Sequence, residues 1–336
     1  MKAKTILFSL AAMLLLQGQG FTLDFHYSMF YESPLTLNPA LTGKVNGSYR
    51  VGVMYRNQYM NLMDNPFVTP SVSFDIPLRF DNGDALGGGV YVLNDQHSAF
   101  SNIRSMLSGA YHKALGADNN SQISLGIQGG YVQEQVDRDD LTFADEYNSS
   151  LEESGNTSEN LSGNSAKYPD FNAGALFNTK VSEDATVFVG GSYFHLIPLK
   201  RSFLDGDNKL KPRLLAHAGA EWDFAERYSM YPGFLYMNQA SAQEMNFGTT
   251  FGYHFLQKPD QNASFYLGGW YRVGDAPIVQ TAVEYQQFKV AFAYDGTVSD
   301  LQDGTANTAN AFEISLSYIG ELQVVKPDTY LFNPRF

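Results

Sequence analysis

The sequence contains no cysteine. This absence excludes thiol catalysis, disulfide bonds and cysteine-ligated metal sites, and it argues against a lipid anchor on an N-terminal cysteine. Charge is also scarce, because Asp, Glu, Lys and Arg make up 17% of the residues, and the formal net charge is −13. Nucleic-acid backbones are bound through Lys and Arg, so an acidic chain does not suit them. The composition fits an exported protein with no nucleic-acid partner.

Long apolar runs are missing too, apart from a short one near the N-terminus. Two lysines precede an apolar run from Thr5 to Leu16, and small or polar residues follow it. About 12 apolar residues are too few to cross a bilayer as a helix. The pattern therefore predicts a signal peptide over residues 1–20, cleaved between Gly18 and Phe21, with a short core helix as the alternative. Cleavage removes the two lysines and takes the formal net charge from −13 to −15.

What the sequence has in quantity is aromatic residues, at 14%, and glycine, with 30 residues. This composition suits a chain whose outer face meets lipid through aromatic girdles, although a soluble β-protein could share it. Apolar and polar residues also alternate in long runs. Between residues 71 and 80, for example, Val72, Phe74 and Ile76 share one face, whereas Asp75 lies on the other. A period of two predicts β-strands.

The length of these runs favours a membrane barrel over a sandwich. The runs extend over roughly 9–13 residues, whereas sandwich strands usually have about 5–6 and a tilted strand needs about 9–11 to cross a bilayer. The face opposite the apolar one carries full charges in mid-strand, at Asp75, Glu221, Glu284 and Glu313. Such charges fit a wet lumen better than a dry core.

Counting the runs predicts an all-β fold, a transmembrane antiparallel barrel of about 14 strands in the outer membrane. The predicted strands are 48–59, 70–80, 85–95, 102–115, 121–137, 170–180, 185–197, 213–224, 228–239, 242–256, 263–274, 276–288, 289–300 and 310–320.

The connections provide an independent argument, because every second one is short. With a periplasmic N-terminus, the short ones are periplasmic turns, and the longest connection, 138–169, is an extracellular loop. We therefore expect one barrel domain over 21–336. It comprises a periplasmic or plug segment (26–47), the barrel (48–320) and a C-terminal tail (321–336).

Motifs for chemistry are few. No two of the six histidines are spaced as a local metal pair, and Asp205–Asn208 resembles a calcium loop that lacks its later ligands. His97 with Asp95, and His195 near a strand end, are the nearest candidates for an enzyme, but neither has an identifiable nucleophile. We expect no catalytic residue, no metal and no cofactor.

The segment from His26 to Gly43 carries a family resemblance. His26–Tyr31, Pro34–Ala40 and Gly43 resemble the opening of the PorP/SprF family, outer-membrane proteins of Bacteroidota associated with the type IX secretion system. Further matching blocks follow in order at 55–59, 73–78, 87–89, 169–174, 268–272, 292–295 and 312–316. The chain departs from the family at Phe21–Phe25, and Asn333 replaces a cysteine in the final motif.

The resemblance implies a non-enzymatic part in secretion or gliding machinery, supporting export or surface attachment of adhesins. Its implied partners are outer-membrane lipid, periplasmic secretion-ring lipoproteins and secreted adhesins. The residues that match the family motifs, and so are candidates for partner contact, are Ser28, Phe30, Asn38, Pro39, Ala40, Gly43, Tyr55 and Arg56.

The segment 26–43 precedes the first strand, so it should be periplasmic or plug the lumen. Asn38–Ala40 should form a turn, and the segment either closes the barrel floor or contacts a partner directly.

The main rival to a secretion role is a porin-like or uptake channel for small or apolar solutes. In such a channel Arg56, Arg79 and Arg272 would lie opposite Asp75, Glu221 and Glu284 and set selectivity. The expected lumen-lining residues are Asp75, Arg79, His217, Glu221, Arg272, Glu284, Asp295 and Glu313.

Overall fold

The computed structural model describes residues 24–60, 65–116, 118–137, 165–197, 210–258, 261–298 and 310–322. The predicted signal peptide, the turn at Asp205–Asn208, most of the predicted 138–169 loop and the tail beyond residue 322 lie outside these ranges.

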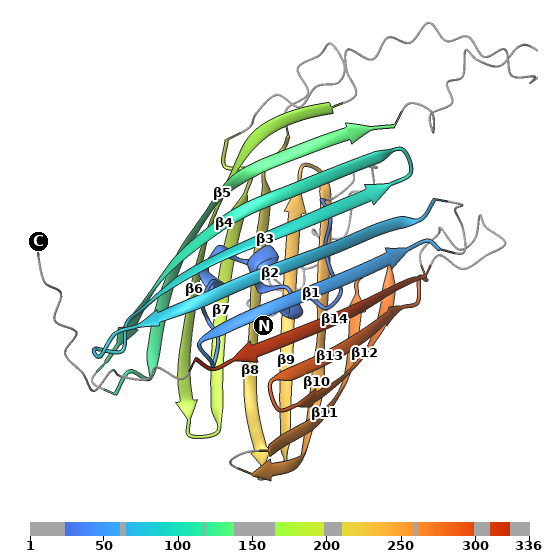
Figure 1. Cartoon of the computed structure of the whole chain (residues 1–336). Coiled ribbons are helices and arrows are strands. Elements are labelled where there is room, and N and C mark those ends of the chain that lie inside the picture. Colours follow the sequence, from blue (N-terminus) through green and yellow to red (C-terminus); the bar gives the residue numbers. More distant parts are fainter. Residues whose placement is uncertain are drawn as a thin grey trace, which may run out of the picture.

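The described residues form fourteen antiparallel strands that close into a barrel, as the alternating runs predicted (Figure 1). Each strand pairs with its neighbours in sequence, and the first pairs with the last from Tyr49 opposite Gly320 to Gln58 opposite Ala311. The strands are β1 (Tyr49–Gln58), β2 (Phe67–Arg79), β3 (Ala85–His97), β4 (Phe100–Leu115), β5 (Ser121–Val136), β6 (Ser165–Ser182), β7 (Ala185–Phe194), β8 (Arg213–Ala225), β9 (Tyr228–Gln239), β10 (Ala242–Lys258), β11 (Gln261–Arg272), β12 (Ala276–Tyr285), β13 (Phe288–Asp295) and β14 (Ala311–Gly320).

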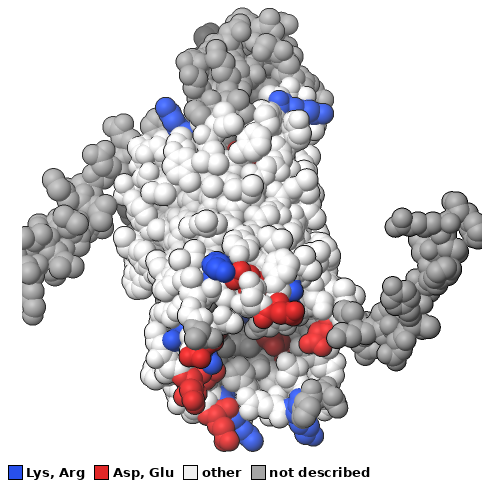
Figure 2. All heavy atoms as spheres, turned by 90° about the vertical axis from the view of Figure 1, so that its left-hand side faces the viewer, with Lys and Arg blue, Asp and Glu red and all other residues white. Residues whose placement is uncertain are grey.

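The barrel has apolar side chains outside and polar side chains inside, the reverse of a soluble protein, as the strand pattern indicated. In β2 the side chains of Val72 and Leu78 are 54% and 59% exposed, whereas Asp75 between them is fully buried. On the face shown in Figure 2, the described strands are broadly uncharged, and charges of both signs gather around a hollow at the lower end. Apolar groups outside and polar groups inside are the arrangement that lipid requires. Among the described residues, no helix is long and apolar enough to cross a membrane.

Several predicted strand limits are wrong. β6 begins at Ser165, five residues before the prediction, because Gln135 in β5 still pairs there. The predicted junction at 288/289 is also misplaced, since β12 ends at Tyr285 and the turn is made by Gln286 and Gln287. Gln286 has a φ of 55°, a left-handed conformation that closes a two-residue hairpin. No Gly or Asn marks this turn, and its position was therefore missed.

The two ends of the barrel differ, as the connection lengths predicted. At one end every hairpin is short, such as the two-residue connections after β6 and β8. We call this the short-turn end. The opposite, long-loop end carries the wide gaps between β5 and β6 and between β7 and β8. By the usual asymmetry of these barrels, the short-turn end faces the periplasm.

The chain before β1 lies inside the barrel (Figure 1). We call residues 24–47 the plug. It contains a 3₁₀ turn η1 (Phe30–Glu32), one turn of α-helix α2 (Pro34–Leu37) and a second 3₁₀ turn η2 (Pro39–Leu41). Its apolar side chains form the main core with inward-facing strand residues; the cluster includes Tyr27, Phe30, Leu35, Leu37, Met54, Leu93, Met106, Met237 and Trp270.

A charge on the lipid face should destabilise the barrel according to its depth in the membrane. Ile127, in the middle of β5, is 69% exposed, and Val181, beside the short turn after β6, is 60% exposed. Ile127→Arg should lower the free energy of unfolding by about 2–4 kcal/mol, and Val181→Arg by about 0–1 kcal/mol. Urea unfolding in lipid vesicles measures both, and equal losses would contradict the assigned outer face.

Candidate functional site: a lumen plug and an adjoining cavity

The plug is built from short turns because its prolines prevent a longer helix. Pro34 and Pro39 each stand in the first turn of a helical element, where a missing N–H costs nothing. Asn38 between them is extended, and its side-chain oxygen accepts a hydrogen bond from the N–H of Ala40 at 2.9 Å. This capped turn lies at the position predicted for Asn38–Ala40.

A buried ionic cluster of Ser28, Arg56, Arg272, Asp295 and Glu313 ties the plug to the barrel wall. The N–H groups of Ser28 and Met29 donate to the Glu313 carboxylate at 2.6 and 2.7 Å. The Ser28 hydroxyl donates to Asp295 at 2.6 Å. Both Arg56 and Arg272 donate to the Ser28 oxygen and to Asp295, and Arg56 also pairs with Glu313.

The side chains of the ionic cluster are nearly inaccessible, since Glu313 is 0% and Asp295 1% exposed. Charges can be buried only when they are paired and hydrogen-bonded, and losing one partner leaves an uncompensated charge. Backbone N–H groups of the plug supply part of this hydrogen bonding. The plug is therefore needed to compensate the buried charges of the wall.

A second set of buried charges holds the outer end of the plug. Asp24 pairs with Arg104, and its other carboxylate oxygen lies 2.7 Å from Nε2 of His195. Nδ1 of His195 lies 3.0 Å from Asp170. Burial alone would raise the pKa of Asp24, but Arg104 and His195 outweigh it and hold that pKa well below its usual range. Asp24 is therefore an anion that anchors the plug near the long-loop end.

The middle of the plug sits against glycines of β5 and β6. The side-chain amide of Asn38 donates to the carbonyls of Ala175 and Gly191 at 3.0 and 3.2 Å. A Cβ added to Gly174 would stand 2.0 Å from the Asn38 oxygen, and one on Gly126 would stand 2.2 Å from the Pro39 backbone. These glycines let the Asn38–Pro39 turn approach the strand backbones closely.

At the short-turn end the plug is fixed by backbone contacts. Asp75 accepts from the Gly43 N–H at 2.7 Å and also binds Arg50 at 2.7 Å. Arg79 donates to the carbonyls of Val45 and Gly47 at 2.5 and 2.9 Å. The plug thus contacts the wall along its whole length, and the chain then turns into β1.

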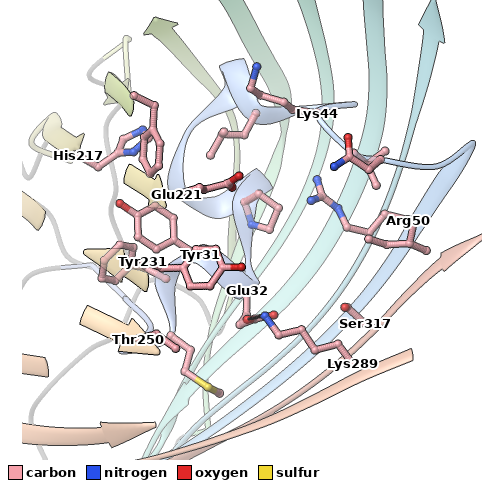
Figure 3. Close-up of a pocket in the computed structure, with 18 of the residues that line it drawn as sticks. Tyr31, Glu32, Lys44, Arg50, His217, Glu221, Tyr231, Thr250, Lys289 and Ser317 are labelled. Carbon is pink, nitrogen blue, oxygen red and sulfur yellow. Dashed lines mark hydrogen bonds and ion pairs between the residues drawn. The ribbon is translucent and has the colours of Figure 1, made fainter. Parts of the chain in front are cut away.

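A cavity of about 740 Å³ lies beside the plug (Figure 3), and its lining includes Arg79, Ala85 and Ile319 at the short-turn end, where the surface is hollowed (Figure 2). Its lining carries aromatic rings, charged groups and histidine. They include Tyr31, Lys44, His217, Glu221, Tyr231 and Trp270. The Lys44 ammonium donates to the amide oxygens of Gln122 and Asn178, at 2.5 and 2.7 Å. Burial lowers the pKa of Lys44 to about 8, and nearby Glu221 only partly opposes this shift.

The structure brings most of the predicted site residues to the plug or its surroundings. Among the motif residues, Phe30 packs edge-on against Trp270, with ring centroids 5.4 Å apart. Tyr55 is the exception, because it faces outward, is 37% exposed and lies against Phe312. The predicted lumen-lining residues all make contacts inside the barrel or line the cavity; they are Asp75, Arg79, His217, Glu221, Arg272, Glu284, Asp295 and Glu313.

The charge pairs differ from the pairing considered for a channel. Arg56 and Arg272 bind Asp295, and neither pairs with Asp75, Glu221 or Glu284 among the described contacts. Asp75 is occupied by Arg50, and Glu284 accepts from the Tyr266 hydroxyl at 3.1 Å. The arginines therefore hold the plug and do not face an open passage.

Sequence reasoning missed Arg104, Asp170, Arg213 and Glu244, which complete the charged shell around the plug. Arg213 donates to the Phe25 carbonyl at 2.8 Å, and Glu244 lies 3.0 Å from His26. All four stand at inward positions of predicted strands, so the alternation of the sequence could have predicted that their side chains point inward. It could not have found the plug residues that bind Arg104, Arg213 and Glu244, because those residues lie on a non-strand segment.

The residues weighed for an enzyme have other contacts. His97 lies 3.6 Å from Asp95, which is itself bonded to Thr69 at 2.7 Å, and His195 stands between two carboxylates. Within the described ranges, no group of three or more His, Asp or Glu side chains is placed to hold a metal ion.

Removing one member of the ionic cluster should loosen the plug. Arg56→Ala leaves Glu313 without its arginine, so the free energy of unfolding should fall by about 3–5 kcal/mol. The amides of Ser28 and Met29 should also exchange hydrogen faster. Mass-spectrometric hydrogen exchange measures the second effect. Arg227→Ala, in an exposed turn, is the control, and equal exchange in both variants would count against the cluster.

Filling the space beside Asn38 should displace the plug without unfolding the barrel. Gly174→Ala puts a methyl group against the Asn38 side chain, and overpacking of this kind costs about 1–3 kcal/mol. The matched control is Gly269→Ala, because a Cβ on this strand glycine meets nothing within 4 Å. Protease cleavage within the plug should rise for Gly174→Ala alone; unchanged cleavage would show that the turn tolerates the methyl group.

Comparison with known proteins was made on sequence and on structure. The family model described as type IX secretion system membrane protein PorP/SprF matches residues 20–318. No curated protein sequence matches the chain significantly.

Solved structures with a similar fold are outer-membrane barrels. The toluene transporter TbuX of Ralstonia pickettii is 12% identical, with a TM-score of 0.51, covering 86% of this chain and 93% of its own. The toluene transporter TodX of Pseudomonas putida is 10% identical, with a TM-score of 0.51 and coverages of 85% and 92%. The monoaromatic hydrocarbon channel CymD is 11% identical, with a TM-score of 0.50 and coverages of 91% and 95%. At these identities the likeness concerns the fold.

The family and the fold are those of a membrane barrel and not those of known enzymes. Since the family match spans most of the sequence, this chain belongs to the PorP/SprF family of type IX secretion system membrane proteins and is a β-barrel of the outer membrane.

Proposed function

We propose that this protein is a plugged, non-enzymatic barrel that supports export or surface attachment of secreted adhesins, with periplasmic secretion-ring lipoproteins as its partners. The observation that carries the proposal is the occupied lumen. The plug is bonded to the wall near both ends and in the middle, through the contacts of Asp24, Asn38 and Gly43. A barrel filled in this way is suited to holding partners in place more than to passive diffusion.

The family motif supports the same proposal. Ser28, Asn38 and Gly43 are among the plug residues that anchor it to the wall. The segment that carries the family pattern bonds its polar groups to the barrel wall. In the proposed function, it thereby sets the shape of the periplasmic face. Partners would then meet the short turns and the mouth of the cavity, and the plug would support that surface from within.

A second candidate function is uptake of apolar solutes. It is favoured by the aromatic rings in the cavity. The ring centroids of Tyr31 and Trp270 lie 6.4 Å apart, and those of Tyr231 and Tyr266 lie 6.0 Å apart. The similar barrels TbuX and TodX are toluene transporters. A channel of this kind requires a route past the plug.

The two functions predict different results for the purified protein and its complexes. For a secretion component, tagged protein extracted from outer membranes should co-purify with ring lipoproteins or adhesins. In planar bilayers it should show little single-channel conductance. Arg56→Ala should raise that conductance by loosening the plug. Substantial conductance of the unmodified barrel, with no co-purified partner, would refute the secretion role and support the channel.

A further inference from the structure

The cavity beside the plug contains two opposite charges that form no ion pair with each other among the described contacts. Lys44 is bonded to the neutral oxygens of Gln122 and Asn178, and no carboxylate of the described residues bonds to it. Glu221 lines the same cavity and makes no hydrogen bond or ion pair among the described contacts (Figure 3). An ammonium group has three donors, and two of those on Lys44 have named acceptors.

Two of the other charges of the cavity are in ion pairs, and two more are bonded to neutral groups. Lys289 binds Glu32 at 2.6 Å, and Arg50 binds Asp75 at 2.7 Å. Arg79 is held by two backbone carbonyls, and Glu284 accepts from a tyrosine hydroxyl at 3.1 Å. Lys44 and Glu221 are therefore the positive and negative groups best placed to meet a ligand of both charges.

Aromatic rings line another part of the same cavity (Figure 3). Tyr31, Phe188 and His217 form one group, with ring centroids 5.7–6.2 Å apart, and Trp270 stands 6.4 Å from Tyr31. Nδ1 of His217, a residue only 2% exposed, has no hydrogen-bond partner in the described structure. Nε2 of His217 accepts from the Asn38 amide at 3.0 Å, so Nδ1 carries the hydrogen and is left to donate. Such a surface suits an aromatic side chain with an acceptor beside it.

The size of the cavity points to more than one residue. Its volume of about 740 Å³ lies within the range of roughly 300–1,000 Å³ for sites that hold drug-sized ligands. A free amino acid would leave much of this space empty, whereas a short peptide would fill more of it.

We propose that this cavity is a binding site for a peptide segment that carries an acidic, a basic and an aromatic side chain. The acidic side chain meets Lys44, the basic one meets Glu221, and the ring lies against Tyr31, Tyr231 and Trp270. The site opens towards the short-turn end, so the segment enters from the periplasm. This inference deepens the proposed secretion function by naming the chemistry of a partner segment.

The test is binding of defined peptides to the full-length protein in lipid nanodiscs, measured by isothermal titration calorimetry. The probe is acetyl-Lys-Phe-Glu-amide, and its uncharged counterpart is acetyl-Gln-Phe-Gln-amide. The Lys44→Met and Glu221→Gln variants should each weaken binding of the charged probe by about tenfold, the loss of one charge-assisted contact. Binding of the uncharged probe should change less than about twofold.

Two matched controls remove the same charges elsewhere. Lys258→Met and Glu226→Gln change exposed side chains at the short-turn end and should leave both affinities unchanged. Thermal unfolding checks that each variant is folded, and Glu221→Gln keeps the test decisive if Lys44→Met disturbs the plug. L-Phenylalanine serves as a third ligand: if it binds as tightly as the tripeptide, the ligand is an amino acid and the peptide assignment is wrong.

Absence of saturable binding by the charged probe would overturn the proposal, as would equal losses for the charged and uncharged probes in both variants. These results are distinguishable from failure of the secretion role. Peptide binding with no co-purified partner would refute the proposed function alone, whereas co-purified partners without peptide binding would refute this site alone.

Discussion

The structure depends on one constraint, which is that lipid offers no hydrogen bonds to a polypeptide backbone. Every N–H and C=O within the bilayer must therefore find a partner in the chain, and an open sheet cannot provide one at its edges. The pairing of β1 with β14 over ten residues meets this requirement by closing the sheet. Closure gives the sheet an outer and an inner face, and successive side chains of each strand point to one or the other. The outer face must be apolar, whereas the inner face is free to be polar.

A polar inner face creates the second problem that the structure solves. Carboxylates such as Glu313 and Asp295 point into a lumen that the plug fills, so they lose contact with bulk water. Arg56, Arg272 and the N–H groups of the plug surround them and supply the hydrogen bonds that water would otherwise make. Plug and wall are thus mutually dependent, since each would leave unpaired polar groups without the other.

The plug also divides the lumen into two unlike regions. Towards the long-loop end the charges are paired around Asp24 and Ser28 and the space is filled. Towards the short-turn end the filling is incomplete, and a cavity remains with Lys44 and Glu221 on its lining. The proposed role of holding partners would require a defined surface rather than a free passage, and this division provides such a surface at the short-turn end.

The sequence by itself determined the barrel, its number of strands and its outer face, because a period of two and the length of the runs are local properties. The local alternation alone predicts that Val72 and Leu78 face outward, and no distant residue is needed for that prediction. It also indicated that Asp75 and Glu313 point inward. Only the tertiary structure decided what those residues meet. Ser28 and Glu313 are 285 positions apart, and the plug that joins them has no strand periodicity from which a register could be read. The turn at Gln286 and the start of β6 at Ser165 were likewise set by pairing with neighbouring strands, which no local pattern encodes.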